Sequence, residues 1–343
     1  MNYIRVVLLS MLVCGVVKGF ALRSFSRANA HGRTFRSSAL SMKLQTGIVG
    51  LPNVGKSTLF NALVGSETAQ AANFPFCTIE PNVGIVNVPD NRLERLAVVH
   101  ESVKTVAATM EFVDIAGIVK GASTGEGLGN KFLTNIRNTD AIVHVVRCFE
   151  DPDIIHVDGN VDPVRDVEVI NLELILADLE QIEKRFEKAK KDRKTEPEEI
   201  AALEKLREAL ELGKMASDAG LDEEELAFVK SLMLLTLKPV IYAANVADSD
   251  LAEGNAMSKK VFDMAAAQGT KAVLVSAQVE SELCGLDPAD KDEFLEALGV
   301  TEESCGLRQL VKTAYERLGL QVRVQIIGVE EAISLGGWGV VGH

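Results

Sequence analysis

The segment Gly50–Thr58 constrains the fold of this chain more than any other feature of its sequence. It lies between a short apolar run at 45–50, which we predict as a buried strand, and a helical pattern at 59–64. In this context G-x-x-x-x-G-K-[ST] forms a loop whose backbone N–H groups surround phosphate oxygens at a helix N-terminus. We therefore predict an α/β fold with a doubly wound sheet. The expected nucleotide-binding residues of this loop are Asn53, Val54, Gly55, Lys56, Ser57 and Thr58.

Residues with the chemistry of a metal–phosphate site follow this loop at suitable spacings. Lys56 supplies a positive charge to the outer phosphates, and the Ser57 hydroxyl is a ligand for Mg²⁺. Thr78, about twenty residues later, is placed to complete the Mg²⁺ shell through a switch loop. Asp114 ends a predicted strand and can hold a Mg²⁺-bound water, while the Gly117 N–H can meet the γ-phosphate. The expected metal ligands are Ser57, Thr78 and Asp114, and Mg²⁺ is the expected cofactor.

A second pair of strand ends is expected to meet the base. The strand at 239–244 ends in Asn245-Val246-Ala247-Asp248, and the strand at 272–275 ends in Ser276. Guanine-specific proteins carry N-K-x-D at the first position, where the Asp accepts hydrogen bonds from guanine. Here Val246 stands in place of the Lys, so an apolar contact is expected to cover the base. Asp248 keeps GTP open as a ligand. Asn245, Val246 and Ser276 join Gly117 as expected nucleotide-binding residues.

Taken together, several motifs resemble those of the Obg-like ATPases, the YchF family, over about residues 44–321. The resemblance implies a P-loop NTPase of the translation-factor class with a GTPase-like fold, a preference for ATP over GTP, and association with the ribosome. We therefore expect a Mg²⁺-dependent NTP hydrolase that acts as a ribosome-associated regulatory switch. The alternatives are a GTP-specific switch and a non-catalytic, nucleotide-gated ribosome-binding module. The motifs are Gly50–Thr58, Ala71–Thr78, Phe112–Ser123, Gly125–Asn130 and Asn245–Asp248.

The group that activates water for hydrolysis is not where Ras-type GTPases carry it. Those enzymes place a Gln directly after D-x-x-G, but here Ile118 and Val119 occupy the positions after Gly117. The family resemblance implies two substitutes: K⁺ bound near Asn53, and a catalytic role for His156 in a loop. The alternative for His156 is an ordinary solvated loop residue. His144 lies within an apolar strand and is expected in the core.

A helical insertion is expected between the two halves of the nucleotide domain. Apolar residues spaced by three or four positions predict two helices, at about 166–191 and 198–214, that pack as a coiled-coil hairpin. A basic cluster at its tip is either a solvated helix end or a contact with ribosomal RNA. The apolar residues are Val169, Leu172, Leu176, Leu179, Ile182, Phe186, Ile200, Leu203, Leu206 and Leu210. The basic residues are Lys184, Arg185, Lys188, Lys190, Lys191, Arg193 and Lys194.

These patterns predict a discontinuous nucleotide domain at 44–163 and 236–318 with a helical insertion at 164–235. Residues 319–343 do not match the small TGS domain that the resemblance places there, so a truncated or aberrant tail is expected. Residues 1–42 combine a short apolar run with a Ser- and Arg-rich stretch, which is typical of a signal plus transit peptide. The expected location is the plastid, with the mitochondrion, secretion and the cytoplasm as alternatives.

Charge and cysteine content limit the partners. The chain has 36 Lys and Arg against 49 Asp and Glu, and residues 1–43 hold basic but no acidic side chains, so the remainder is strongly acidic. A body of this charge is a poor general binder of DNA, and no membrane association is expected of the mature form. The five Cys lie far apart without a C-x-x-C pair, which excludes a zinc ribbon and favours a reducing compartment.

Overall fold

The computed structural model describes residues 6–13, 44–65, 82–115, 117, 121, 128–157, 159–301 and 306–328, and the statements below concern these ranges. The chain forms two compact units, which we describe separately. One consists of Leu44–Val86 with Met110–Ala314, and the other of Met1–Lys43, Asn87–Thr109 and Tyr315–His343. The expected helical insertion at 164–235 therefore groups with the nucleotide domain in one unit. The expected site residue Thr78 lies outside the described ranges, as do Ile118 and Val119.

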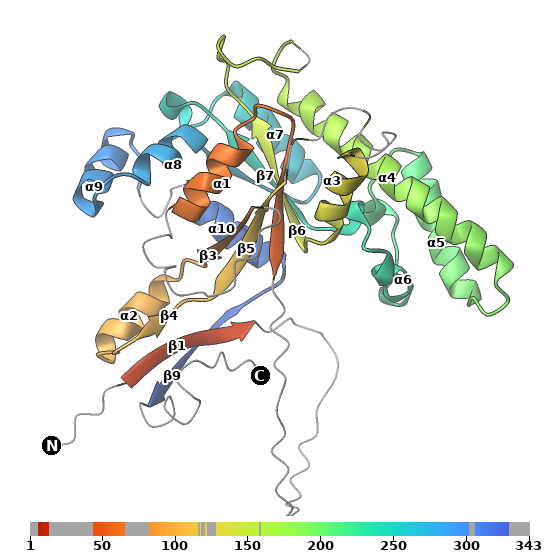
Figure 1. Cartoon of the computed structure of the whole chain (residues 1–343), viewed down its shortest axis with the longest axis horizontal. Helices are drawn as coiled ribbons and strands as arrows, with labels where there is room; N and C mark the ends of the chain where they lie inside the picture. Colours follow the sequence, from red (N-terminus) through yellow and green to blue (C-terminus); the bar gives the residue numbers. More distant parts are fainter. Residues whose placement is uncertain are drawn as a thin grey trace, which may run out of the picture. The chain divides into compact units, whose positions relative to one another are not determined.

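A six-stranded sheet forms the centre of the larger unit, in the order β3-β5-β2-β6-β7-β8 (Figure 1). β2 pairs in parallel with β5 and β6, and β7 pairs in parallel with β6 and β8. All seven residues of β6 are buried, as expected of a strand covered on both faces. The predicted doubly wound α/β fold is confirmed. The strands are β2 (Gln45–Val49), β3 (Val83–Asn87), β5 (Thr109–Asp114), β6 (Ala141–Arg147), β7 (Val240–Asn245) and β8 (Lys271–Val275).

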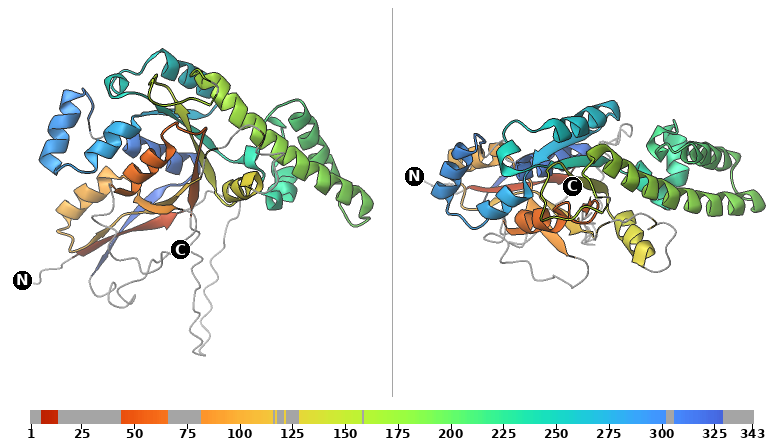
Figure 2. Two further views of the ribbon diagram at one scale, coloured as in Figure 1. Left: turned by 45° about the horizontal axis from the view of Figure 1, so that its top comes forward. Right: turned by 90° about the horizontal axis from the view of Figure 1, so that it is seen from above.

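Helices cover this sheet on both sides, and Figure 2 shows α1 and α7 on opposite faces. One apolar cluster under α7 contains Val146, Tyr242, Ala244, Val261 and Leu295 and holds the sheet against its helices. None of the helices in the described ranges has both the length and the hydrophobicity needed to cross a membrane. The helices on the sheet and near it are α1 (Lys56–Gly65), α3 (Leu128–Arg137), α7 (Ala256–Ala267), α8 (Ala277–Leu283), α9 (Pro288–Ala297) and α10 (Gly306–Arg317).

The predicted helical hairpin is present as α4 (Pro163–Lys191) and α5 (Pro197–Glu211), followed by α6 (Glu223–Val229). Asp162 caps α4, and its side chain accepts from the backbone N–H of Arg165. Ile182 and Phe186 pack against α5 as predicted, in one cluster with Leu203, Leu206 and Leu210.

The predicted apolar face of α4 is wrong in the first half of this helix. Leu172 and Leu176 are 49% and 39% exposed, whereas Ile170 and Leu174 are buried. The start of α4 packs against the α/β core, since Val167 lies in the apolar cluster under α7, whereas Ile175 already lies in the cluster with α5. A single apolar stripe that faces one partner helix therefore does not describe the buried face of α4. Buried carboxylates lie on this helix as well.

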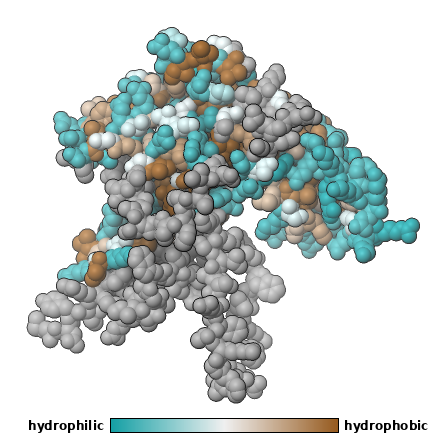
Figure 3. Space-filling model, viewed as in Figure 1, coloured by the Kyte–Doolittle hydropathy of each residue, from teal (hydrophilic) through white to brown (hydrophobic). Residues whose placement is uncertain are grey.

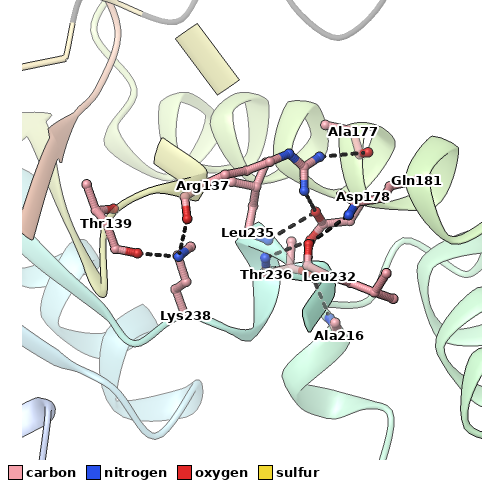
Figure 4. A network of polar contacts seen from close by, with 10 residues as sticks. All are labelled: Arg137, Thr139, Ala177, Asp178, Gln181, Ala216, Leu232, Leu235, Thr236 and Lys238. Carbon is pink, nitrogen blue, oxygen red and sulfur yellow. Dashed lines mark hydrogen bonds and ion pairs between the residues drawn. The ribbon is translucent and has the colours of Figure 1, made fainter. Parts of the chain in front are cut away.

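One of these buried carboxylates, Asp178, joins three segments at the base of the hairpin (Figure 4). It is 0% exposed and accepts hydrogen bonds from the backbone N–H groups of Leu235 and Thr236, at 3.0 and 2.8 Å. The Thr236 hydroxyl donates to it at 2.8 Å, and Arg137 at the end of α3 forms an ion pair at 3.3 Å. Burial raises the pKa of Asp178, and the hydrogen bonds from Thr236 and Leu235 oppose that shift. The network connects α3, α4 and the short helix Leu235–Leu237.

The smaller unit contains a three-stranded sheet in the order β4-β1-β9. β1 (Val6–Val13) pairs in parallel with β4 (Thr105–Val106) and antiparallel with β9 (Val322–Gly328). Helix α2 (Asn91–Val99) precedes β4 and is capped by Asp90. The apolar run of the expected presequence thus forms β1, and the expected C-terminal tail supplies β9. The targeting role of residues 1–42 stays a prediction.

Replacement of the buried carboxylate tests the network at the hairpin base. Asp178→Ala removes the acceptor of two backbone N–H groups and a hydroxyl, and it leaves the Arg137 guanidinium with the Ala177 oxygen but without its carboxylate. We therefore expect a loss of about 3 kcal/mol in the free energy of unfolding. Urea denaturation of the variant measures this, with Glu180→Ala, an exposed carboxylate on the same helix, as the control. Equal stability of the two variants would contradict the proposed importance of the network.

Candidate nucleotide-binding site

The glycine loop lies where the sequence predicts it, between β2 and the first residue of α1, Lys56. Gly55 has φ +95° and packs so closely that a Cβ built on it would lie 2.5 Å from Nδ2 of Asn245. No other residue type fits this position without moving Asn245. Val54 is buried, whereas Ser57 and Thr58 are exposed at the start of α1. The loop therefore turns its backbone and the helix N-terminus outward, as a phosphate-binding loop requires.

Lys56 is held inside this loop. Its Nζ donates to the backbone oxygen of Leu51 at 2.6 Å, and the residue is 7% exposed. Burial lowers the pKa of Lys56 to about 8, and the nearby Asp114 carboxylate opposes the shift. A phosphate oxygen is a stronger acceptor than a carbonyl, and it would also stabilise the charged form of the ammonium. The side chain is thus poised to exchange its carbonyl partner for a phosphate.

Ser57 and Asp114 lie together although they come from different elements. The Ser57 Oγ donates to Asp114 Oδ2 at 2.9 Å, which joins the start of α1 to the end of β5. The other carboxylate oxygen, Oδ1, is buried and has no hydrogen-bond partner among the described residues. A hydroxyl and a carboxylate are hard oxygen donors that suit Mg²⁺, and an orphaned buried carboxylate oxygen is the kind of atom that a metal-bound water satisfies. The residues present therefore fit the implied ion.

Gly117, the last residue of D-x-x-G, lies against the glycine loop. A Cβ built on it would be 3.1 Å from the backbone nitrogen of Pro52 and 3.2 Å from Nζ of Lys56. A side chain at this position would crowd the lysine. The structure thus places the backbone of Gly117 beside the group expected to meet the outer phosphates.

The expected base-reading residues are largely engaged with the protein itself. Asn245 is 3% exposed; its Nδ2 donates to the Val54 oxygen at 2.9 Å, and its Oδ1 accepts from the Ala277 N–H at 2.9 Å. Ser276 is 0% exposed and caps α8, since its Oγ accepts from the Val279 N–H. Asn245 therefore joins the glycine loop to the start of α8. Its expected contact with a purine edge stays a prediction.

The expected apolar cover over the base is also not found. Val246 is 2% exposed and packs in the apolar cluster under α7, so its side chain does not form an open surface. Its neighbour Asp248 is exposed, and one of its oxygens accepts from the Ser249 N–H at 2.7 Å. The strand end turns its branched side chain inward because β7 is a central strand with both faces covered.

His156 is not the solvated loop residue of the alternative reading. It is 7% exposed, and its Nε2 lies 2.8 Å from Oδ2 of Asp166 in the first turn of α4. The preceding residue, Ile155, accepts a hydrogen bond through its backbone oxygen from Nδ2 of Asn53 at 3.1 Å. The His156 loop therefore meets the glycine loop, but the imidazole is turned towards α4. Catalysis by His156 stays a prediction and requires the ring to leave Asp166.

Known proteins of one family are similar to this chain over most of its length. Residues 45–201 match the family described as "50S ribosome-binding GTPase". The chain is 52% identical over 285 residues to "Ribosome-binding ATPase YchF" of Bacillus subtilis (strain 168), covering 81% of this chain and 77% of that protein. It is 51% identical over 284 residues to the protein of that name from Escherichia coli O157:H7, with 82% and 77% covered. The chain belongs to the YchF family.

A solved structure of the family agrees with the fold. "Structure of the Schizosaccharomyces pombe YchF GTPase" matches with a TM-score of 0.70 and 36% sequence identity, covering 83% of this chain and 80% of that one. Membership in the YchF family makes this chain a nucleotide-hydrolysing P-loop protein. The names of the relatives differ on the nucleotide, because the bacterial proteins are called ATPases and the yeast protein a GTPase.

Several functional positions of this YchF chain were not found from its sequence. Arg147 ends β6, is 2% exposed, and donates to the backbone oxygens of Phe149, Asp151 and Ile154, so it shapes the loop that leads to His156. A charged residue at the end of an otherwise largely apolar strand is a signal that could have marked it. Asp166 gave no such signal, because an acidic residue at a helix N-terminus is ordinary.

His144, 3% exposed, is in the core as predicted, and burial lowers its pKa to about 3.

The lowered pKa of Lys56 predicts a pH dependence of nucleotide binding. Triphosphate binding favours the charged ammonium, so affinity should be at its full value well below pH 8 and fall as pH rises through about 8, by up to about tenfold per unit above it. Calorimetry in two buffers of different ionisation enthalpy at about pH 8.5 would report the uptake of about 0.8 proton on binding, because about three quarters of the free lysine is neutral at that pH. An affinity that is constant between about pH 7 and 9 would contradict the role of Lys56.

Proposed function

We propose that this chain binds and hydrolyses ATP in a Mg²⁺-dependent reaction, accepts GTP less well, and acts as a ribosome-associated regulatory switch. The observation that carries the proposal is the meeting of Lys56, Ser57, Asp114 and Gly117 around the glycine loop. The names of the bacterial relatives, which are ribosome-binding ATPases, support both the nucleotide and the partner.

In this proposal the chain's own residues bind and orient the triphosphate. Lys56 exchanges the Leu51 carbonyl for phosphate oxygens, and the loop N–H groups surround the remaining ones. Ser57, Asp114 and the sequence-predicted Thr78 would hold Mg²⁺, which neutralises charge that develops on the phosphates. The Gly117 N–H holds the γ-phosphate in place for attack by water. K⁺ is a further candidate cofactor near Asn53, whose bond to Ile155 uses the amide N–H and leaves Oδ1 as the atom that would bind the cation.

The proposed preference for ATP rests on the absence of a guanine-specific lysine from the segment Asn245–Asp248. Val246, buried in the core, offers no lysine stem to pack over a guanine ring. Asn245 holds two loops together through both ends of its amide. Asp248 is exposed and could still accept hydrogen bonds from guanine, which supports weaker binding of GTP as a second substrate.

Calorimetric titration with ATP and GTP in the presence of Mg²⁺ tests this proposal. We expect ATP to bind at least as tightly as GTP, and Lys56→Ala to lose tight binding of both, because Lys56 is the side-chain charge that the loop directs at the outer phosphates. Lys260→Ala, which removes an exposed lysine from α7, is the matched control and should bind like the parent. Tenfold tighter binding of GTP, about 1.4 kcal/mol, would contradict the ATP preference.

The tip of the hairpin supports contact with ribosomal RNA. Figure 3 shows the outer end of α4 and α5 as a predominantly hydrophilic surface. Some of its basic residues pair with carboxylates, such as Lys191 with Glu187 at 3.6 Å and Arg185 with Glu199. Arg193 and Lys194 are exposed in the turn between the helices, where phosphate groups can approach them.

Charge reversal at the turn tests the ribosome contact. We expect Arg193→Glu with Lys194→Glu to weaken co-sedimentation with ribosomes and to reduce the slope of log affinity against log salt by about 2, one for each lost phosphate contact. Lys259→Glu with Lys260→Glu, an adjacent exposed pair on α7, is the control. An unchanged salt slope in the turn variant, or an equal loss in the control, would contradict this contact.

A further inference from the structure

Helix α4 carries three buried carboxylates, and each of them binds a different segment of the nucleotide domain. Asp166, Glu173 and Asp178 are 3%, 4% and 0% exposed. Asp166 binds His156 in the loop after β6, and Asp178 binds Arg137 at the end of α3. Because burying a carboxylate without partners is very unfavourable, each of these side chains must be matched to the segment it holds. The partner of Glu173 has the most direct connection to the triphosphate.

Glu173 holds the segment that follows D-x-x-G. Its Oε1 accepts a hydrogen bond from the backbone N–H of Gly121 at 2.6 Å. Gly121 has φ +87°, in the left-handed region that residues with a Cβ avoid. The short bond and this backbone conformation together fix the position of Gly121 on α4. The contact is made by the backbone, so the sequence of the segment gives no sign of it.

The other end of the same segment touches the phosphate-binding loop. The backbone of Gly117 lies against Pro52 and Lys56, so closely that a Cβ would be 3.1 and 3.2 Å from their atoms. Only residues 118–120, which lie outside the described ranges, separate Gly117 from Gly121. A fully extended chain spans at most about 3.6 Å per residue, so an anchor at Gly121 restricts where Gly117 can go. Glu173 thereby limits the movement of the group that meets the γ-phosphate.

We propose that Glu173 is a positioning residue for nucleotide hydrolysis, which acts through Gly121 on the placement of Gly117. The proposal rests on the proposed function, because it concerns the rate of that reaction. Glu173 holds Gly121, whereas Lys56 bonds to Leu51 and Ser57 bonds to Asp114, so loss of Glu173 leaves the bonds of these phosphate-binding groups in place. Without the anchor at Gly121, Gly117 can take more positions, only some of which hold the γ-phosphate correctly for attack. The effect belongs to turnover rather than to affinity.

Alanine and glutamine substitutions at this position separate the two effects. In the full chain, we expect Glu173→Ala to lower the single-turnover rate of ATP hydrolysis by about 10- to 100-fold while the calorimetric Kd for ATP stays at the parent value. Glu173→Gln keeps an oxygen that can accept from the Gly121 N–H, so it should recover most of the rate. Glu168→Ala, which removes an exposed carboxylate of the same helix, should match the parent in both measurements.

A second variant tests the anchor from its other end. Gly121→Ala strains the left-handed backbone and should lower the rate without weakening ATP binding. If both residues act through one contact, Gly121→Ala should add little to the loss caused by Glu173→Ala. A purely structural role for Glu173 would instead give additive losses, or losses of rate and affinity together. If Glu173→Ala does not fold, Gly121→Ala and Glu173→Gln decide the question alone.

The outcomes for the two proposals differ. A parent chain that binds ATP but shows no turnover contradicts the proposed function and this inference with it. A parent that hydrolyses ATP beside a Glu173→Ala variant of equal rate contradicts the positioning role only. A variant that loses ATP affinity in proportion to its rate also contradicts it, because Glu173 would then support the binding site as a whole.

Discussion

The nucleotide site depends on one buried side chain, the amide of Asn245. It accepts from the Ala277 N–H and donates to the Val54 oxygen, so it joins the start of α8 to the glycine loop. Its close packing on Gly55 leaves no room for a Cβ there. A phosphate-binding loop needs its backbone N–H groups in a fixed arrangement. The bond from Asn245 to the Val54 oxygen holds the loop in its shape from the protein side. Lys56 and Ser57, which begin α1, come directly after Val54 and Gly55, so this bond holds the loop next to both of them.

Helix α4 is the second element on which the structure depends, because it is the first helix of the hairpin and also packs against the nucleotide domain. Its N-terminal part, with Val167, packs on the α/β core, and from Ile175 onward it packs in the cluster with α5. A single rigid helix that holds the His156 loop, the segment at Gly121 and the end of α3 brings the hairpin into direct contact with segments near the triphosphate. This arrangement gives the proposed switch a physical route between nucleotide and ribosome that needs no additional element.

Local patterns in the sequence predicted the elements, but tertiary packing decided which side chains do what. The strand–loop–helix at Gly50–Thr58 and the core position of His144 could be predicted, since both depend on short apolar runs and a specific motif. The inward face of α4 could not, because a helix that packs on two partners has no single apolar stripe. The roles of Asn245 and Glu173 could not be predicted either. The amide of Asn245 bonds to residues far away in the sequence, such as Val54 at a separation of 191. Glu173 binds a backbone N–H, which any residue type would supply.

The most direct test of this account is a crystal structure of the chain with Mg²⁺ and a non-hydrolysable ATP analogue. The account predicts that Nζ of Lys56 leaves the Leu51 oxygen for the outer phosphates, that the bond between Ser57 and Asp114 opens around Mg²⁺, and that the bonds of Asn245 remain. Nucleotide bound away from the glycine loop, or Lys56 still bonded to Leu51 in the complex, would contradict the central claim that these residues form a triphosphate site.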